Sequence, residues 1–187
     1  MRLFAAVLPP EPAAAELAAA VRPLHALPGA DGLRWTERAG WHFTLAFYGE
    51  VADRLLPELH ARLARAARRH PPHELRLAGG GRFADRALWA GVAGDRTALR
   101  RLADSAVAGA RRAGLALDEH HPYRPHLTLA RTRTPVNLRP YVAGLADFEG
   151  EPWTAAELSL VRSNLPGGGE PGRQPRYETV AAWPLGG

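Results

Sequence analysis

The chain has 187 residues, 46% of them hydrophobic, with 24 basic and 19 acidic residues and no cysteine. This length can bury a real core without metals or disulfides, and the lack of cysteine excludes thiol catalysis and cysteine-based zinc sites. No apolar run approaches the roughly 18 residues of a membrane helix. Prolines and Glu11 follow the short N-terminal apolar run too early for a secretory signal. We therefore expect a cytoplasmic protein without membrane association.

The net charge is +5, and all 24 basic residues are arginines. Two interpretations stay open at this point. The arginines can be solvated surface residues of a protein from a GC-rich genome, or they can attract a polyanion, because guanidinium pairs bidentately with phosphate.

Apolar spacing and turn residues predict elements of similar order in the two halves of the chain. The first half should hold strands at 2–8, 33–35 and 41–48, an Ala-rich helix reaching about residue 25, and a helix at 51–69. The second should hold strands at 74–79, 86–94, 126–131, 154–163 and 176–185, and helices at 96–113 and 136–145. Gly114 is placed to end the long helix. Gly79–Gly81 and the Gly/Pro-rich stretch 165–175 are expected to be turns or loops, the latter mobile.

This order predicts an α+β fold of two pseudo-symmetric, βαβ-rich lobes with antiparallel sheets around a central cleft. No polar linker separates the halves, so we expect one domain, residues 1–187, with intertwined strands.

Two segments repeat a His-x-Thr-Leu pattern: "GWHFTLAFYGEV" at 40–51 and "PYRPHLTLARTR" at 122–133. Side chains of a regular strand alternate between faces. Alternation puts His42, Thr44, Ala46 and Tyr48 on one side and Phe43, Leu45 and Phe47 on the other. In the same way, His126, Thr128 and Ala130 should share one face.

If the two lobes face each other, both imidazoles would lie opposite one substrate. Histidine has an ordinary pKa near 6.5, so one ring can accept a proton while the other donates one. This pairing suits in-line displacement at phosphorus. The threonine hydroxyls can donate to the non-bridging oxygens, where negative charge builds. The scheme needs no metal and no cofactor.

Other chemistries fit the sequence less well. Asp118, Glu119, His120 and His121 lie close to His126, but their spacing matches no metal-ligand pattern and prolines preclude a helix there. The chain has three serines and no Gly-x-Ser-x-Gly. Neither Gly-Gly-Gly run carries the Lys-Ser/Thr of a phosphate-binding loop.

Together, "RLFAAVLPP", "GLRWTERAGWHFTLAFYGEV", "RALWAGV", "YRPHLTLAR" and the late "LVRS…Y" resemble the bacterial and archaeal RNA 2′,3′-cyclic phosphodiesterases. These enzymes were first named 2′-5′ RNA ligases and belong to the 2H phosphoesterase superfamily. The resemblance runs from residue 2 to about residue 185. It implies opening of an RNA 2′,3′-cyclic phosphate to a 2′-phosphate, with weak reversible 2′-5′ ligation along the same path. The implied partner is RNA with such an end, tRNA fragments included, and we expect a monomer.

The resemblance also implies roles for individual residues. His42 would be the acid that protonates O3′ and His126 the base that activates water, although the motifs alone leave that order open. Thr44 and Thr128 would complete the catalytic set. Arg131 matches the arginine that commonly contacts phosphate, but strict alternation points it away from His126, so a bulge or strand end is needed to turn it inward.

The sequence departs from the family where a basic residue and a leucine are more usual, since it has Ala46 and Tyr48. We therefore expect Arg34 or Arg124 to replace the missing phosphate contact. The stretch 165–175 also looks longer than is typical.

Two alternatives remain: a 2H enzyme acting on small cyclic nucleotides or another cyclic phosphate, and an RNA-binding protein without catalysis. The second would draw its stacking surface from Trp35, Trp41, Tyr48 or Tyr123, each of which can equally be core packing. Trp89, Trp153 and Trp183 are predicted to lie in the core.

Overall fold

The structure is a computed structural model that describes residues 1–117, 122–165 and 174–187. Its strands are β1 (Arg2–Val7), β2 (Arg34–Trp35), β3 (Phe43–Glu50), β4 (His73–Phe83), β5 (Ala87–Gly94), β6 (Leu127–Arg131), β7 (Trp153–Ala155), β8 (Glu157–Asn164) and β9 (Arg176–Pro184). Its helices are α1 (Glu11–Val21), α2 (Leu56–Arg69), α3 (Arg96–Arg112) and α4 (Arg139–Leu145). Short 3-10 helices lie at Arg22–Ala26, Ala30–Gly32, Arg38–Gly40 and Asp53–Leu55.

The strands form one sheet in the order β7-β4-β5-β6-β3-β1-β8-β9, and β2 pairs with β6. All the strand pairs of the sheet are antiparallel. The two strands that follow the histidines, β3 and β6, are neighbours at the centre and meet through the pair Phe43–Leu127. The predicted α+β fold with antiparallel strands is therefore confirmed, and it brings the two motifs together.

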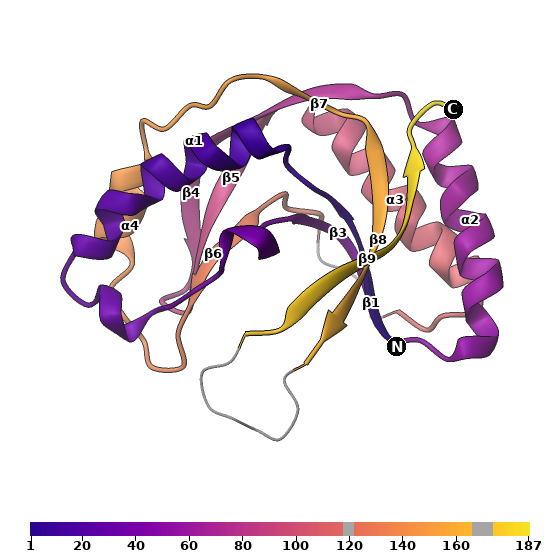
Figure 1. Cartoon of the computed structure of the whole chain (residues 1–187), viewed down its shortest axis with the longest axis horizontal. Coiled ribbons are helices and arrows are strands. Elements are labelled where there is room, and N and C mark those ends of the chain that lie inside the picture. The colour runs from indigo at the N-terminus through magenta and orange to yellow at the C-terminus, as the bar shows by residue number, and fades with distance from the viewer. Residues whose placement is uncertain (118–121, 166–173) are drawn as a thin grey trace.

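The helices lie on two flanks of the sheet (Figure 1). Helix α2 packs against β8 and β9 and α3 against β3 and β4, whereas α4 packs against β4 and β5 and α1 against β4. The first pair lies at the right of Figure 1 and the second at the left, with the strands between them. The apolar residues Leu3, Ala5 and Val7 of β1 join the main core, while Phe4 and Ala6 join a separate small cluster with Val161 on the opposite side. We call this opposite side, which also carries His42 and Thr44, the inner face.

The two long helices follow the sequence pattern closely. In α2, Leu59, Leu63, Ala66 and Ala67 recur at helical spacing and are buried. In α3, the Asp95 carboxylate accepts the Ala98 N–H at 3.0 Å, which caps the first turn. Gly114 ends this helix with a φ of +100°, as predicted. The predicted start of α2 at residue 51 is wrong, because residues 53–55 form a 3-10 turn and Pro57 occupies the first turn of the helix.

The glycines at 79–81 are not the predicted turn, since β4 continues through them to Phe83. The register shifts between Leu77 and Gly80, so this segment is a bulge within the strand. A Cβ at Gly81 would lie 2.2 Å from the Trp89 ring. Glycine is needed there because the neighbouring indole lies directly on the backbone. None of the helices in the three described ranges is long and apolar enough to cross a membrane.

Candidate active site

A bulge in β3 changes which residues follow Thr44 onto the inner face. Ala6 of β1 pairs with Thr44, and Ala5 pairs with Ala46, so Leu45 is an extra residue between the two pairs. Directly opposed residues of an antiparallel pair share a face. Ala46 therefore lies on the core side with Ala5, and both are buried. The prediction that Ala46 shares the side of His42 is wrong because the bulge breaks strict alternation.

The next pairs along β3 extend this correction. Phe4 pairs with Phe47, which places Phe47 on the inner face, where it is 51% exposed. Tyr48 is buried instead, and its hydroxyl donates to the Ala106 carbonyl of α3 at 3.0 Å. Burial raises the pKa of this phenol. The prediction that Tyr48 faces the site is therefore wrong, and Phe47 is the aromatic residue that sequence reasoning missed.

The second motif strand has the same irregularity. Trp89 pairs with Thr128 and Leu88 pairs with Ala130, so Leu129 is the extra residue. Ala130 lies with the fully buried Leu88 in the core, against the prediction that it shares the side of His126. Arg131, the next residue, pairs with Ala87 and turns onto the inner face. This is the bulge that an inward Arg131 requires.

Both imidazoles are oriented by the same backbone contact. His42 Nδ1 lies 2.7 Å from the Gly40 carbonyl, and His126 Nδ1 lies 2.8 Å from the Arg124 carbonyl. In each case the acceptor is two residues earlier, so each ring donates from Nδ1 and keeps Nε2 for a reacting group. Both rings are partly exposed. The two histidines are thus presented in equivalent tautomers.

Aromatic rings hold each imidazole in place. The His42 ring lies 4.6 Å from the Phe4 centroid and 5.1 Å from that of Tyr177. The His126 ring lies 4.8 Å from Phe83 and 6.2 Å from Trp89. The assignment of Trp89 to the core is therefore wrong, because its pairing with Thr128 puts it on the inner face.

The surroundings of His42 favour its neutral form. Burial is the main cause that lowers its pKa from 6.5, and the positive charges of His126 and Arg131 lower it further. The hydrogen bond to Gly40 acts in the opposite direction. The charges of His126 and Arg131 thus act on the His42 ring from the neighbouring strand.

The remaining predicted residues lie in different surroundings. Thr44 and Thr128 are both partly exposed on the inner face. Arg34 is exposed and pairs directly with Arg131 across β2 and β6. Arg124 is exposed and holds His126 through its carbonyl.

Most of the aromatic residues predicted as a possible stacking surface pack against other parts of the protein. Tyr123 lines a separate pocket with Arg96 and Arg100 of α3, and burial raises its pKa. Trp41 is buried, and Trp35 stacks on His25 with ring centroids 4.0 Å apart. Trp153 lies in the core as predicted, and Trp183 packs partly buried against it.

No group of three or more His, Cys, Asp or Glu side chains within the described ranges is arranged to hold a metal ion. The carboxylates and imidazoles at 118–121 lie outside the described residues, as do residues 166–173 of the predicted loop.

Comparison with known proteins places this architecture. The pattern of the 2′-5′ RNA ligase superfamily matches residues 9–166. An RNA 2′,3′-cyclic phosphodiesterase of Geobacillus stearothermophilus is 30% identical over 156 residues, which cover 81% of this chain and 47% of that protein. This chain thus spans about half the length of that relative. An RNA 2′,3′-cyclic phosphodiesterase of Thermus thermophilus is 33% identical over 180 residues, covering 88% of this chain and 83% of the other.

Solved structures agree over the whole chain. A crystal structure of a Thermus thermophilus protein matches with a TM-score of 0.77 and 29% identity, covering 100% of this chain and 99% of that one. Escherichia coli LigT in its apo form has a TM-score of 0.77 and 24% identity, covering 98% and 96%. The fold is therefore that of the LigT-like phosphoesterases. The chain belongs to the 2′-5′ RNA ligase superfamily, which includes RNA 2′,3′-cyclic phosphodiesterases.

Proposed function

We propose that this protein hydrolyses RNA 2′,3′-cyclic phosphate ends to 2′-phosphomonoesters by acid/base catalysis between two histidines, without a metal. The observation that carries the proposal is the convergence of the two bulged strands. The equal Nδ1 contacts leave both imidazole Nε2 atoms free next to neighbouring strands, and the bulge in β6 turns the Arg131 guanidinium onto the inner face. Family membership supports the same reaction class.

In the proposed reaction, His126 Nε2 takes a proton from water, whose oxygen forms the new bond to phosphorus. The bond from phosphorus to O3′ breaks, and His42 Nε2 donates a proton to that oxygen. The negative charge on the non-bridging oxygens is met by the Arg131 guanidinium and by the hydroxyls of Thr44 and Thr128. Each proton and each bond is accounted for by this chain, water and substrate.

An acid must be protonated when the reaction begins, yet burial lowers the pKa of His42 in the free protein. Bound substrate opposes this effect, because a phosphodiester anion beside the ring stabilises the imidazolium form. Substrate binding therefore prepares His42 for its role.

Phe47 gives the substrate a base-binding surface. Its half-exposed ring lies on the inner face two pairs away from Thr44, and the Arg2 guanidinium carbon lies 4.9 Å from the ring centroid. Aromatic rings stack on any nucleobase. We assign Phe47 to the nucleobase of the terminal nucleotide and Arg131 to its phosphate.

The test is incubation with an RNA oligonucleotide ending in a 2′,3′-cyclic phosphate, in EDTA, with identification of the product terminus. The expected product carries a 2′-phosphate, which identifies O3′ as the leaving group. His60→Gln, on α2 and away from the inner face, is a matched control for loss of an imidazole. Loss of activity in EDTA, or a 3′-phosphate product, contradicts the proposal.

A binding-only protein is the second candidate, because the fold alone does not require catalysis. It would give salt-dependent RNA affinity with no product after long incubation. The equal Nδ1 contacts of the two imidazoles on neighbouring strands favour the enzyme, since RNA binding alone does not need both rings to keep Nε2 free.

A further inference from the structure

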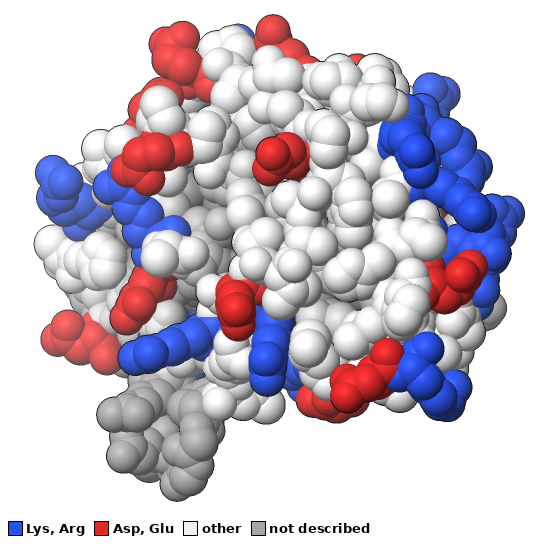
Figure 2. Space-filling model, turned by 45° about the vertical axis from the view of Figure 1, so that its right-hand side comes forward, with Lys and Arg blue, Asp and Glu red and all other residues white. Residues whose placement is uncertain are grey.

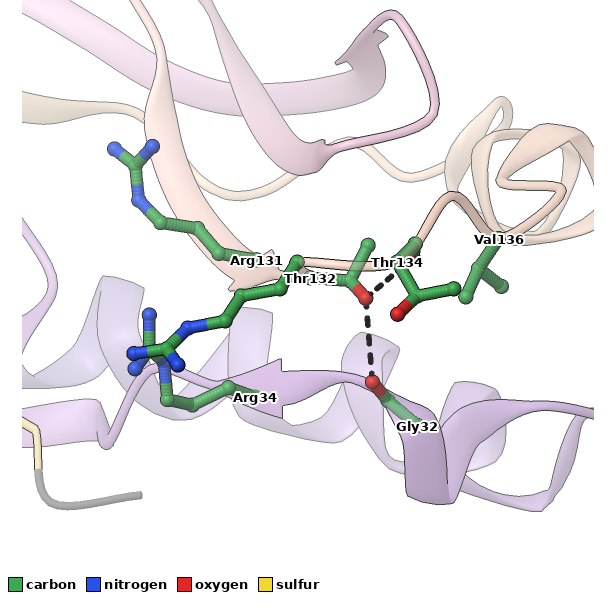
Figure 3. Close-up of a pocket in the computed structure, with 7 residues that line it drawn as sticks. Gly32, Arg34, Arg131, Thr132, Thr134 and Val136 are labelled. Carbon is green, nitrogen blue, oxygen red and sulfur yellow. Dashed lines mark hydrogen bonds between the residues drawn. The ribbon is translucent and has the colours of Figure 1, made fainter. Parts of the chain in front are cut away.

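A second cationic site adjoins the histidine pair. Gly32, the ends of β2 and β6 and the turn that follows β6 enclose an open pocket of about 480 Å³ (Figure 3). It is lined by Gly32, Arg34, Arg131, Thr132, Arg133, Thr134 and Val136. Arg131 belongs to both places, because its pairing with Ala87 turns it onto the inner face that carries the histidines. The pocket therefore shares Arg131 with the proposed reaction site.

The pocket gathers like charges that a structural role would not favour. Arg34 and Arg131 are directly opposed on β2 and β6, a position in which like charges are destabilising. Figure 3 shows both side chains extending in the same general direction, away from Val136. Arg133 adds a third exposed guanidinium two residues later. An anion that enters the pocket would relieve the repulsion among these exposed arginines.

The described lining residues include no carboxylate that would neutralise these arginines. The acidic residues next to the lining segments face other groups. The Asp31 carboxylate lies close enough to the Tyr141 hydroxyl to raise the pKa of that phenol, after the larger effect of burial. Asp85 accepts a hydrogen bond from Arg82 at 3.2 Å. Much of the basic surface of the protein lies elsewhere, along one edge of the view in Figure 2.

The backbone under the pocket is held in place before any ligand arrives. The Thr132 hydroxyl donates to the Thr134 carbonyl at 2.6 Å and lies 3.4 Å from the Gly32 carbonyl. The Thr132 N–H donates to the Arg86 carbonyl at 2.9 Å, and the Arg86 guanidinium donates to the Arg133 carbonyl. A fixed turn lowers the entropy cost of anion binding, since less of the site must be ordered on contact.

We propose that Arg34 and Arg133 form a second phosphate subsite that binds the 5′-phosphate of the nucleotide whose cyclic phosphate is held by Arg131. This inference rests on the proposed function and narrows its substrate class. The only other phosphate attached to a 2′,3′-cyclic nucleotide at an RNA 3′ end is the one on its 5′ oxygen. The planar guanidinium fork suits phosphate oxygens. The protein therefore prefers RNA ends over free nucleoside 2′,3′-cyclic phosphates, which lack the 5′-phosphate.

The kinetic test compares adenosine 2′,3′-cyclic phosphate with the same compound carrying a 5′-phosphate. The wild type should show a kcat/KM about tenfold higher with the 5′-phosphate, the size expected of two exposed charge-assisted contacts. The double variant Arg34→Ala/Arg133→Ala should reduce this ratio to about one. Arg65→Ala, at an exposed position of α2, removes a positive charge at a distance and should keep the full ratio.

The outcomes separate this inference from the proposed function. If the wild type hydrolyses both compounds equally well, the second subsite is wrong and the reaction stands. If neither is hydrolysed, the proposed function fails, and calorimetry with 2′-AMP and adenosine 2′,5′-bisphosphate still tests the subsite. The subsite is supported if the wild type binds the bisphosphate about tenfold more tightly than 2′-AMP, while the double variant binds the two compounds equally. Equal affinities in the wild type overturn it.

Discussion

The two motif strands use one backbone device for two different purposes. In β3 and in β6 the histidine contacts the carbonyl two residues earlier, the threonine follows on the inner face, and a leucine bulges. The bulge then brings the third residue after the threonine inward, which is Phe47 in one strand and Arg131 in the other. The backbone is repeated, but one strand ends in a nonpolar ring and the other in a cation.

This difference gives the site a direction. In the proposed reaction, an aromatic surface beside the first motif and a guanidinium beside the second cannot exchange roles, so a nucleotide has one productive orientation. In the proposed reaction, the strand repeat provides the acid/base pair, and the unmatched residue after each bulge sets how the substrate lies. Substitutions at both kinds of position can show which features of the two strands are equivalent and which are not.

The largest expected effect is the loss of either imidazole. His42→Ala and His126→Ala should each lower the hydrolysis of cyclic phosphate ends by about 10²- to 10⁴-fold, because each removes one proton transfer. Circular dichroism should report a native fold for both variants. An activity within tenfold of wild type for either one would show that the two motifs do not act together.

Arg131→Ala should lower kcat by about 10²-fold, since it removes a charged donor from oxygens that gain charge in the transition state. Arg131→Lys keeps the charge without the fork, so it should restore only part of the rate. Single-turnover kinetics would separate this effect from binding. A change in KM alone would assign Arg131 to substrate binding rather than to the reacting phosphate.

Phe47→Ala should raise KM for a cyclic nucleotide by roughly 5- to 150-fold, equivalent to the 1–3 kcal/mol of one stacked base. Phe47→Trp should keep most of the affinity, because any aromatic face can stack. The decisive contrast is with Arg131→Ala, which should act mainly on kcat. If Phe47→Ala leaves KM unchanged, the ring does not contact the base.

Tyr48→Phe tests the bulge itself. The buried Tyr48 hydroxyl donates to the Ala106 carbonyl, so its removal should cost about 0.5–1.5 kcal/mol of unfolding free energy in denaturant titrations. Hydrolysis should not change, since this side chain lies on the core side of β3. Strict alternation would predict the reverse, with altered kinetics and unchanged stability.

The smallest effect concerns stability against pH. Because the folded pKa of His42 is below 6.5, the unfolded chain binds more protons between that value and 6.5. Stability should therefore rise with pH across this window and be lost on acidification below about 6.5. The free energy of unfolding, measured by urea titration from pH 5 to 8, should rise less steeply with pH in His42→Gln than in the wild type. An identical slope would show that another group, such as His70, causes all of it.

Much of the site was predictable from the sequence because it depends on local patterns. The two His-x-Thr-Leu repeats located both strands of the candidate site, and the family resemblance implied roles for their residues. The face of the sheet on which the residues after each threonine lie was not predictable. Each bulge depends on the pairing of β3 with β1 or of β6 with β5. Strict alternation therefore misplaced Ala46, Tyr48 and Ala130 and overlooked Phe47. The glycines at 79–81 were wrongly predicted to form a turn for a similar reason. Glycine is required there by the Trp89 ring on the adjacent strand, which local sequence does not show.

The most direct test of the central claim is a histidine-detected NMR titration with 2′-AMP, using His42→Gln and His126→Gln to assign the two imidazoles. If the motif strands converge on one phosphate, both sets of ring signals should shift with a single dissociation constant. The His42 ring should also titrate at a higher pH in the complex, because the phosphate stabilises its charged form. A shift confined to one histidine, or two different dissociation constants, would contradict a shared site.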